Sequence, residues 1–476
     1  MVTTTRSMRM GTENGVAARG RRLAGGRRVL GHGSGRALLG VAMAGALGAA
    51  LATGVALGGV VPGRVAAATA APITLRFSEY PRPAEDEMLK VLLPAFEKQT
   101  GIHVVYEPVT DATSMTTKMV AGTAPDVVCW WGEDLYFWGL QGMLVDLNPY
   151  IANGTIPASD LEDFAPGQIH GFRAAGRQYA LPQYLGTVAM YYNRDAFDTA
   201  GLPELGQQTT WQSFLDVARK LTIRQDNKVT QWGFYLYYEL DRVAYWVRQN
   251  GGQLYPGDDR TTCLLDQPAA TEALQFWADL INKYHVAPHL AEFNLGLRDG
   301  FAQGKVATAA DGSWSLAFMM PSVKFRLGIA ELPAGPVARS TLANMDGYGV
   351  YSGTKHEKEA VELLKFLVSP LANQLRAEYQ ALQPARGSVA KQWADRLLEK
   401  YPNARGAQLM VFAASARYAA PGPIYADPKA AQALLNPAFS RIFEQGQSAE
   451  VVMKSVVPTL NARLRQAVAA KAGGQK

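Results

Sequence analysis

The chain after residue 72 begins with an alternation of strand-like and helix-like segments, and this alternation constrains the fold more than any other feature. Ile73–Phe77, Ile102–Tyr106 and Asp126–Trp130 are short apolar runs of the length of a strand. A segment with helically spaced apolar residues separates the first two runs, and a polar, helix-like segment separates the second from the third. This order predicts a parallel sheet in an α/β fold.

The first predicted helix has recognisable ends. It covers Asp86–Thr100, and Gly101 stands where a glycine commonly terminates a helix. Pro94 inside the segment predicts either a later helix start or a kink. Further amphipathic helices are predicted behind the cap residue Thr210, around Leu274–Tyr284, at Ala360–Val368 and at Val451–Leu464.

The length of the chain predicts more than one structural unit. Its 476 residues are too many for one ordinary domain and enough for two lobes, each with its own core. No repeat of fixed period and no low-complexity linker separates two contiguous halves. We therefore expect the chain to cross between the lobes more than once.

Residues 1–71 have the composition of an export signal. An arginine-rich start precedes the apolar run Ala37–Val61 and the alanine-rich tract Val65–Ala71. Arginine pairs at 21–22 and 27–28 favour a twin-arginine signal, although the usual flanking residues are missing. An uncleaved membrane anchor is the alternative, because the apolar run is about long enough to span a bilayer.

The basic character of the chain belongs to this leader. The first 70 residues carry nine Arg, one Glu and no Lys or Asp, a net charge of +8, whereas the whole chain has a net charge of +6. The remaining residues therefore carry −2, and the pI of about 9.1 does not predict binding to nucleic acid.

The positions of the cysteines help to predict where the mature protein is located. No cysteine precedes Cys129, so the residue that a bacterial lipid anchor requires is missing. We expect the mature protein to be free in the periplasm or outside the cell after cleavage of the leader. Cys129 and Cys263 are the only cysteines and are too few for a disulfide framework. We expect both to be reduced and buried, with one disulfide as the alternative.

The motifs of common enzymes are missing. There is no Gly-x-Ser-x-Gly sequence. His285 and His289 are four residues apart, but Pro288 lies between them, which favours a turn over a metal site. Gly300–Val306 has the wrong spacing for a phosphate loop. Carboxylates are numerous enough for a glycosidase pair, but the pattern of strands and helices is not that of a barrel. We expect no enzyme activity, no metal and no cofactor.

Aromatic residues stand beside acidic or small residues at several predicted loops and strand ends. Most large aromatic side chains fill cores, so the combination carries the argument. An aromatic plane can receive the C–H face of a sugar while carboxylates bind its hydroxyls, at about 1.5–3 kcal/mol for each charged hydrogen bond. Open α/β sheets bind ligands at the carboxyl ends of their strands. The combinations are Glu79 with Tyr80, Trp130 and Trp131 with Glu133 and Asp134, Tyr237 and Tyr238 with Asp241, Asp311 with Trp314, and Gly347 with Tyr348.

One ambiguity concerns the adjacent tryptophans. Trp130 is the favoured stacking residue and Glu133 its hydrogen-bonding partner, because Trp130 falls at the carboxyl end of the third predicted strand and Glu133 lies in the turn after it. Neighbouring residues of a strand point to opposite faces, so either Trp130 or Trp131 is expected to face the core unless the strand has already ended.

The order of motifs in the mature chain resembles that of extracellular solute-binding proteins of the sugar-binding ABC-transporter class, the group that includes maltose-binding protein. No single motif is specific, but the order and spacing of the motifs together support the resemblance. The motifs are Phe96–Ile102, Gly122–Val128, Gly142–Leu147, Tyr179–Pro182, Met190–Phe197, Thr210–Trp211, Asn250–Gly252, Phe301–Val306, Asp311–Trp314 and Pro384–Arg386.

The resemblance implies two α/β lobes joined by crossover strands, with a ligand between lobes that close by hinge motion. The crossovers are expected near Tyr184, at Val306–Ala310 and at Gly347–Tyr351. The leader is followed by lobe I at 72–184 plus 309–348 and by lobe II at 185–308 plus 349–476.

The resemblance also implies a ligand site. Trp130 with Glu133 and, from the other side, Trp314 are expected to hold sugar, and the Glu79–Arg82 loop is expected to contact it. Arg386 either touches ligand or forms a structural ion pair. The full set of expected ligand-binding residues is Glu79, Tyr80, Arg82, Trp130, Trp131, Glu133, Asp134, Tyr184, Tyr237, Tyr238, Asp241, Asp311, Trp314, Gly347, Tyr348 and Arg386.

The expected function is that of a monomeric substrate-binding subunit that delivers a mono- or oligosaccharide to the permease of an ABC importer. A protein that binds another polar solute, such as a polyol or a glycerophosphodiester, is the alternative. A polysaccharide-cleaving enzyme is a more distant one. No contact with nucleic acid is expected, nor any with the membrane except through the permease.

Overall fold

A computed structural model describes residues 72–82, 84–257 and 259–473, and the predicted leader lies outside this part of the chain. The strands are β1 (Thr74–Ser78), β2 (His103–Tyr106), β3 (Val127–Trp131), β4 (Arg173–Ala174), β5 (Arg177–Gln178), β6 (Leu181–Asn193), β7 (Ile223–Gln225), β8 (Lys228–Gln231), β9 (Thr308–Gly312), β10 (Leu327–Ala330), β11 (Thr341–Val350) and β12 (Ala419–Pro421).

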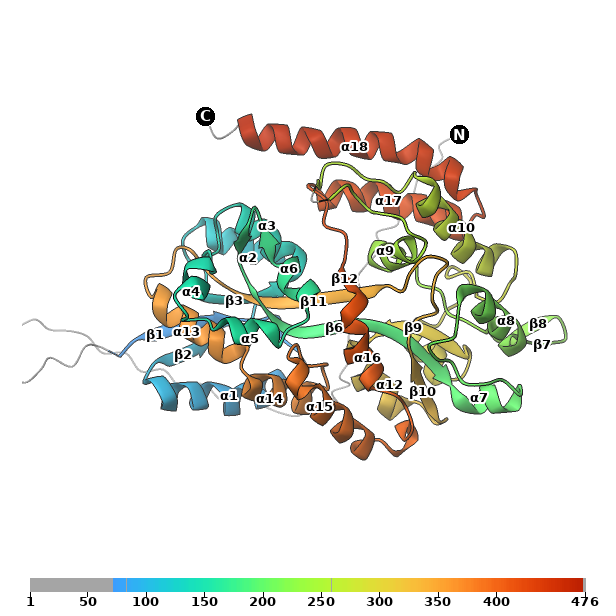
Figure 1. Ribbon diagram of the computed structural model, residues 1–476, viewed down its shortest axis with the longest axis horizontal. Coiled ribbons are helices and arrows are strands. Elements are labelled where there is room, and N and C mark those ends of the chain that lie inside the picture. The colour runs from blue at the N-terminus through green and yellow to red at the C-terminus, as the bar shows by residue number, and fades with distance from the viewer. Residues whose placement is uncertain (1–71, 83, 258, 474–476) are drawn as a thin grey trace, which may run out of the picture. The chain divides into compact units, whose positions relative to one another are not determined.

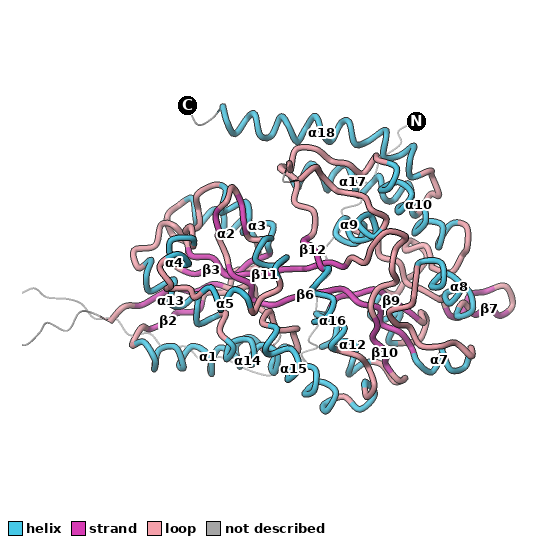
Figure 2. Tube along the Cα trace, in the orientation of Figure 1, coloured by secondary structure: helices cyan, strands magenta, loops and turns pink. Residues whose placement is uncertain are grey.

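The helices surround these strands (Figure 2). They are α1 (Glu85–Thr100), α2 (Ala112–Val120), α3 (Gly132–Leu140), α4 (Asn148–Ala152), α5 (Ala158–Glu162), α6 (Pro166–Gly171), α7 (Arg194–Thr199), α8 (Trp211–Leu221), α9 (Leu240–Gln249), α10 (Pro268–Asn282), α11 (Leu297–Ala302), α12 (Leu316–Ser322), α13 (Glu357–Leu367), α14 (Pro370–Gln380), α15 (Gly387–Lys400), α16 (Met410–Ala414), α17 (Pro428–Phe443) and α18 (Ala449–Gly473).

The predicted opening pattern is confirmed. β1 lies between β2 and β3 and is parallel to both. Helix α1 ends where Gly101 adopts a left-handed φ of 74°, and it continues through Pro94 without a break. Helix α8 begins at a capping box, in which the Thr210 side chain accepts from the backbone N–H of Ser213.

Two long strands, β6 and β11, pair with each other and link β9 and β10 to β3, β1 and β2 (Figure 1). The first half of β6 pairs with β11, and its second half pairs with β9 and β10. The β11 strand pairs with β12 through Thr341–Ala343 and with β3 through Asp346–Val350. All residues of β6 are buried. The strand that contains Tyr184 and the one that contains Gly347 therefore both run through the sheet, whereas β9 pairs with the second half of β6 and, through an isolated bridge, with Tyr235.

The hydrophobic clusters show where single elements pack. Leu363 and Leu364 of α13 are buried in one cluster with Leu75 and Phe77 of β1. Helix α1 contributes to the same cluster, so α13 packs with elements of the expected lobe I, whereas residues 349–476 were expected in lobe II. The boundaries of the two lobes stay a prediction.

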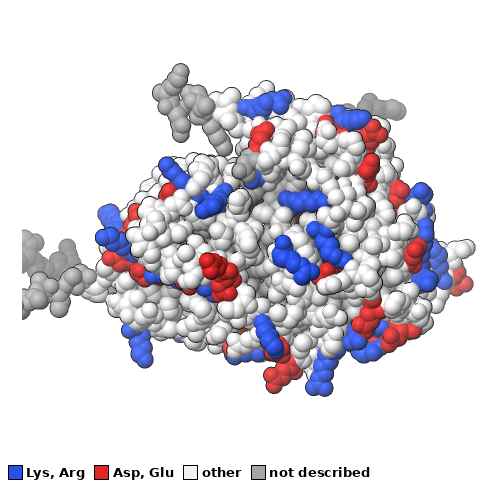
Figure 3. Space-filling view, in the orientation of Figure 1, with Lys and Arg blue, Asp and Glu red and all other residues white. Residues whose placement is uncertain are grey.

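Three smaller expectations can be compared with the described residues. Cys129 and Cys263 are both buried and unpaired. Among the residues that the structure describes, no helix has both the length and the apolar composition needed to cross a membrane. On the face drawn in Figure 3, basic and acidic side chains are both present and are interspersed along the lower and right-hand edges.

Candidate ligand-binding site

The larger of two neighbouring cavities has a volume of about 590 Å³ and is open to solvent. Five elements far apart in the sequence form it: the beginnings of α3 and α9, the start of β11, the segment after β12, and one face of α17. The volume lies within the range of small-molecule sites, about 300–1,000 Å³. Its lining residues are Trp131, Gly132, Glu133, Asp134, Glu239, Leu240, Asp241, Leu342, Ala343, Asn344, Met345, Pro421, Gly422, Pro423, Ile424, Gln432 and Asn436.

Trp131, and not Trp130, presents its indole to this cavity. β3 continues through Trp131, so the two neighbouring side chains point to opposite faces. Trp130 is 2% exposed and packs in a hydrophobic cluster, whereas Trp131 is 47% exposed. The expectation that Trp130 lines the site is therefore wrong. Trp131 keeps an accessible ring, which lies 5.8 Å from the ring centre of Tyr80.

Two carboxylates follow Trp131 in the first turn of α3. Acidic residues are favourable there because the helix N-terminus carries partial positive charge. Burial, with the neighbouring Asp134 carboxylate, raises the pKa of Glu133 to about 7. Burial raises the pKa of Asp134 to about 6. Both side chains line the cavity and form no ion pair with a described Lys or Arg, so both can bind a ligand.

The second cavity has a volume of about 470 Å³ and adjoins the first, because Glu239 lines both. It is a mixed aromatic and charged site. Its lining residues are Tyr235, Tyr237, Glu239, Arg242, Gly296, Leu297, Arg298, Asp299, Asp311 and Trp314.

Buried Arg242 organises the wall of this second cavity. Its Nη2 donates to Asp311 Oδ1 at 3.1 Å, and its Nε lies 3.7 Å from Asp241 Oδ2. Both carboxylates raise the pKa of Arg242 despite its burial, which acts in the other direction. The guanidinium carbon lies 5.3 Å from the ring centre of Trp314, within cation–π distance.

Trp314 fits its place because two glycines leave room for the indole. A Cβ at Gly186 would lie 2.7 Å from Cζ3 of Trp314, and a Cβ at Gly312 would lie 2.2 Å from the same ring. Both contacts are shorter than ordinary carbon–carbon contacts. The backbone of β6 and β9 therefore supports one side of the ring, which is half-buried and lines the cavity on its other side.

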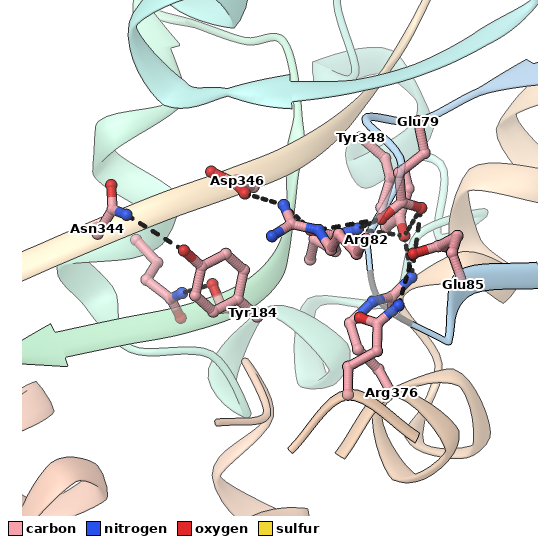
Figure 4. Close-up of polar contacts among 11 residues, drawn as sticks. Glu79, Arg82, Glu85, Tyr184, Asn344, Asp346, Tyr348 and Arg376 are labelled. Atoms are coloured by element: carbon pink, nitrogen blue, oxygen red, sulfur yellow. Dashed lines mark hydrogen bonds and ion pairs between the residues drawn. The ribbon is translucent and has the colours of Figure 1, made fainter. Parts of the chain in front are cut away.

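Four of the expected ligand contacts belong instead to a buried polar network beside the cavity (Figure 4). Arg82 Nη2 donates to the Asp346 carboxylate and, at 3.3 Å, to Gln183 Oε1. Its Nε lies 3.7 Å from Glu79 Oε1, and its guanidinium lies over the ring of Tyr184. Burial disfavours the charge of Arg82, but the carboxylate of Asp346 holds its pKa well above the usual value.

The other end of the network meets α14. The hydroxyl of Tyr348 donates to Glu79 Oε2 at 3.1 Å and accepts a hydrogen bond from Arg376, which is also buried. Gln380 Nε2 donates to Glu85 Oε2 at 2.5 Å. Burial and the Glu79 carboxylate raise the pKa of Glu85 to about 8. Glu79, Arg82, Tyr184 and Tyr348 line neither cavity, and the hydroxyl of Tyr184 accepts a hydrogen bond from Asn344, which does line the first cavity. Their contact with a ligand stays a prediction.

Other expected residues also lie outside the cavities. Tyr80 packs against both Trp130 and Trp131, so it supports the cavity wall. Tyr238 stacks on Phe443 and donates to Glu444, and buried Gly347 lies against Phe172.

Arg386 forms a structural ion pair, which was one of the two roles expected for it. It is 3% exposed, and its Nε donates to the carbonyl oxygen of Val368 at 2.6 Å. Its Nη1 donates to Asp163 Oδ2 at 3.2 Å.

The structure thus brings seven of the expected residues into the two cavities and adds others that the sequence did not indicate. The expected residues that line the cavities are Trp131, Glu133, Asp134, Tyr237, Asp241, Asp311 and Trp314. Asn344, Glu239, Arg242 and Arg298 were missed, as were Gly422, Gln432 and Asn436; Glu239 and Arg242 had a signal, since they flank Asp241. Within the described residues no group of three or more His, Cys, Asp or Glu could hold a metal ion.

The family of the chain follows from comparison with known proteins. The model of the family described as bacterial extracellular solute-binding protein matches residues 75–374, more than half of the chain. The chain therefore belongs to the bacterial extracellular solute-binding protein family. This membership confirms the predicted class, which is a solute-binding protein and not an enzyme.

Single relatives are more distant. An arabinooligosaccharide-binding protein of Halalkalibacterium halodurans is 26% identical over 242 residues, 48% of this chain and 52% of that protein. A periplasmic sn-glycerol-3-phosphate-binding protein of Yersinia pestis is 25% identical, over 41% of this chain and 46% of that protein. In these alignments the chain spans about half the length of the curated relatives.

Solved structures confirm the predicted fold class over a longer stretch. The structure of an ABC substrate-binding protein from Listeria monocytogenes in complex with cycloalternan superposes with a TM-score of 0.70 at 21% identity. The superposition covers 83% of this chain and 99% of that chain.

Proposed function

We propose that the chain is the extracytoplasmic substrate-binding subunit of an ABC importer and that it binds an oligosaccharide in the two adjoining cavities. The observation that carries this proposal is the placement of an accessible indole in each cavity, Trp131 in one and Trp314 in the other, with carboxylates beside both. A pyranose ring presents an apolar C–H face and a rim of hydroxyls, which matches an aromatic plane bordered by hydrogen-bond acceptors.

The size of the site favours an oligosaccharide over a monosaccharide. The cavities have volumes of about 590 and 470 Å³ and share Glu239. One sugar unit on each indole would occupy both cavities, and the residues between them would contact the linkage. The names of the relatives agree, since one binds arabinooligosaccharide and a solved structure contains cycloalternan.

The proposed partners follow from this role. Ligand binding between elements on either side of the cavities would stabilise a closed form, and the permease of an ABC importer would receive the ligand. The leader, with its arginine pairs, would direct export by the twin-arginine route, and the mature protein would act as a monomer in the periplasm or outside the cell.

A phosphate-containing solute is the second candidate, because one relative binds glycerol phosphate. Arg242 and Arg298 line the second cavity and supply positive charge. However, Arg242 is paired with Asp311, and Arg298 Nε also lies 3.8 Å from Asp311 Oδ2. The first cavity has no Lys or Arg among its lining residues, so a phosphate ranks below a sugar.

Isothermal titration with a panel of neutral oligosaccharides, monosaccharides and glycerol phosphate tests the proposal. We expect at least one sugar to bind without being converted, and we expect Trp131→Ala and Trp314→Ala each to weaken that binding about tenfold. Turnover of the sugar, or binding of glycerol phosphate alone, would contradict the proposal.

A further inference from the structure

We infer that the ligand of the first cavity is an amino sugar, that is, a saccharide with a positively charged amine. This inference rests on the proposed sugar-binding function and specifies the chemical class of the sugar. The cavity and its exposed indole define the site; the charges of its lining define what the site accepts.

Four carboxylates line this one cavity. Glu133 and Asp134 come from the start of α3, and Glu239 and Asp241 come from the start of α9. No Lys, Arg or His is among the lining residues. The charged groups of the lining are therefore all acidic, and its side-chain donors are neutral, namely the amides of Asn344, Gln432 and Asn436 and the indole N–H of Trp131.

The neighbouring cations do not neutralise the acids of α3. Arg242 binds Asp311 and lies near Asp241. Arg248 Nη2 donates to the carbonyl oxygen of Pro421 at 2.8 Å, and Arg260 lies over the ring of Tyr255. The described part of the chain contains no ion pair of Glu133 or Asp134.

Helix stability alone does not account for this arrangement. Acidic residues in a first turn stabilise a helix through its dipole, and that effect requires no particular direction of the side chain. Here the first turns of two helices, more than a hundred residues apart in sequence, direct their acids into the same cavity. Glu133 and Asp134 have no ion-pair partner in the described part of the chain and repel each other when both are ionised, whereas Asp241 lies near Arg242; a ligand with positive charge relieves this repulsion.

An ammonium group suits the site better than a hydroxyl. It supplies three N–H donors and a charge, whereas a carboxylate only accepts. Charge-assisted hydrogen bonds are about twice as strong as neutral ones. The Trp131 ring adds an aromatic face on which the sugar that carries the amine can stack.

The test compares sugars that differ only in the group at one carbon. Isothermal titration of the purified protein uses three matched sets, each with an amine, an acetamide and a hydroxyl member: glucosamine, galactosamine and chitosan oligosaccharides with their counterparts. Maltodextrin, arabinooligosaccharide and galactooligosaccharide are included as neutral sugars of other linkages. We expect an amine member to bind about tenfold more tightly than its counterparts, with an affinity that falls as salt is raised.

Variants separate charge from general damage. Glu133→Gln removes one cavity charge with little change of shape, and we expect it to weaken amine binding about tenfold while neutral sugars change much less. Glu362→Gln is the matched control, because Glu362 lies on α13 beside Lys365, outside the lining of both cavities. Thermal unfolding of each variant verifies that it folds.

Each outcome is decisive. Tighter binding of any neutral sugar than of every amine sugar overturns the inference but leaves the proposed function intact. Equal losses for amine and neutral sugars in Glu133→Gln overturn it as well, because the carboxylate would then act only as an acceptor. If no sugar binds, the proposed function itself fails, and the inference fails with it.

Discussion

Trp131 and Asp346 lie directly opposite each other in the antiparallel ladder between β3 and β11. The Asp346 side chain binds buried Arg82, whereas the Trp131 indole lines the cavity. The Trp131–Asp346 pair therefore connects the strand that carries the exposed ring to the buried ionic network of Arg82. Changes at the two positions should have different consequences, one for binding and one for stability.

The two adjacent tryptophans give the first prediction. Trp131→Ala should weaken sugar binding about tenfold, equivalent to about 1.4 kcal/mol, because it removes the accessible ring. Trp130→Ala should instead lower the free energy of unfolding by about 3–5 kcal/mol, because it leaves a cavity in a packed cluster. Titration calorimetry and urea unfolding of both variants measure the two effects. The opposite assignment of the effects would show that the roles of the rings are reversed.

The buried ion pair gives the second prediction. Asp346→Asn removes the charge that Arg82 faces, and loss of one partner of a buried pair costs about 3–5 kcal/mol of unfolding free energy. Urea unfolding measures this cost. Asp395→Asn is the matched control, since its pair with Lys391 is exposed at the surface and should contribute little. Similar stabilities for the two variants would argue against a structural role of the network.

The raised pKa of Glu133 gives the third prediction. In the unfolded chain a glutamate has a pKa of about 4.3, whereas the folded value is about 7. Between these values the folded protein binds more protons, so the free energy of unfolding decreases as the pH rises. Glu133→Gln removes this decrease. Thermal unfolding should therefore show a higher Tm than the parent at pH values above about 7 and little difference near pH 4.3. A Tm difference that is the same at both pH values would mean that Glu133 is not the group responsible.

The support of Trp314 by glycine gives the fourth prediction. Gly186→Ala places a methyl group where the Trp314 ring now lies, so the ring must move. We expect sugar binding to weaken about tenfold or more, measured by titration calorimetry on protein whose folding is checked by circular dichroism. Gly387→Ala serves as the control, because its nearest neighbour, the Asp163 carbonyl oxygen, would be 3.6 Å away. Unchanged binding in Gly186→Ala would mean that Trp314 does not contact the ligand.

Local patterns predicted much of the fold. Apolar runs and a terminal glycine were enough to place β1, β2, β3 and α1 within about two residues. The long partnership of β6 with β11 could be expected only through the resemblance, because its residues are about 160 positions apart and no local signal links them.

The site was less predictable for a physical reason. Acidic and aromatic residues at strand ends indicate either ligand contacts or buried pairs, and the difference depends on distant partners. Glu79 and Tyr348 have such a partner in Arg376 on α14. Strand β3 ends at Trp131, one residue later than predicted, and the end of the strand decides which of Trp130 and Trp131 faces the cavity. Cavity residues such as Asn436 lie on the exposed face of a helix, where a polar residue carries no signal.

The burial of β6 affects how the chain can fold during synthesis. Its partners β9, β10 and β11 are all made later, so the first half of β6, which pairs with β11, stays unpaired until the ribosome has passed residue 350. At about 5–20 residues per second, the interval is roughly 8–30 seconds. Unpaired apolar strands are prone to aggregation for as long as they remain exposed. A nascent chain of this protein therefore has a defined period in which a chaperone that binds the 181–193 segment would raise the yield of folded protein.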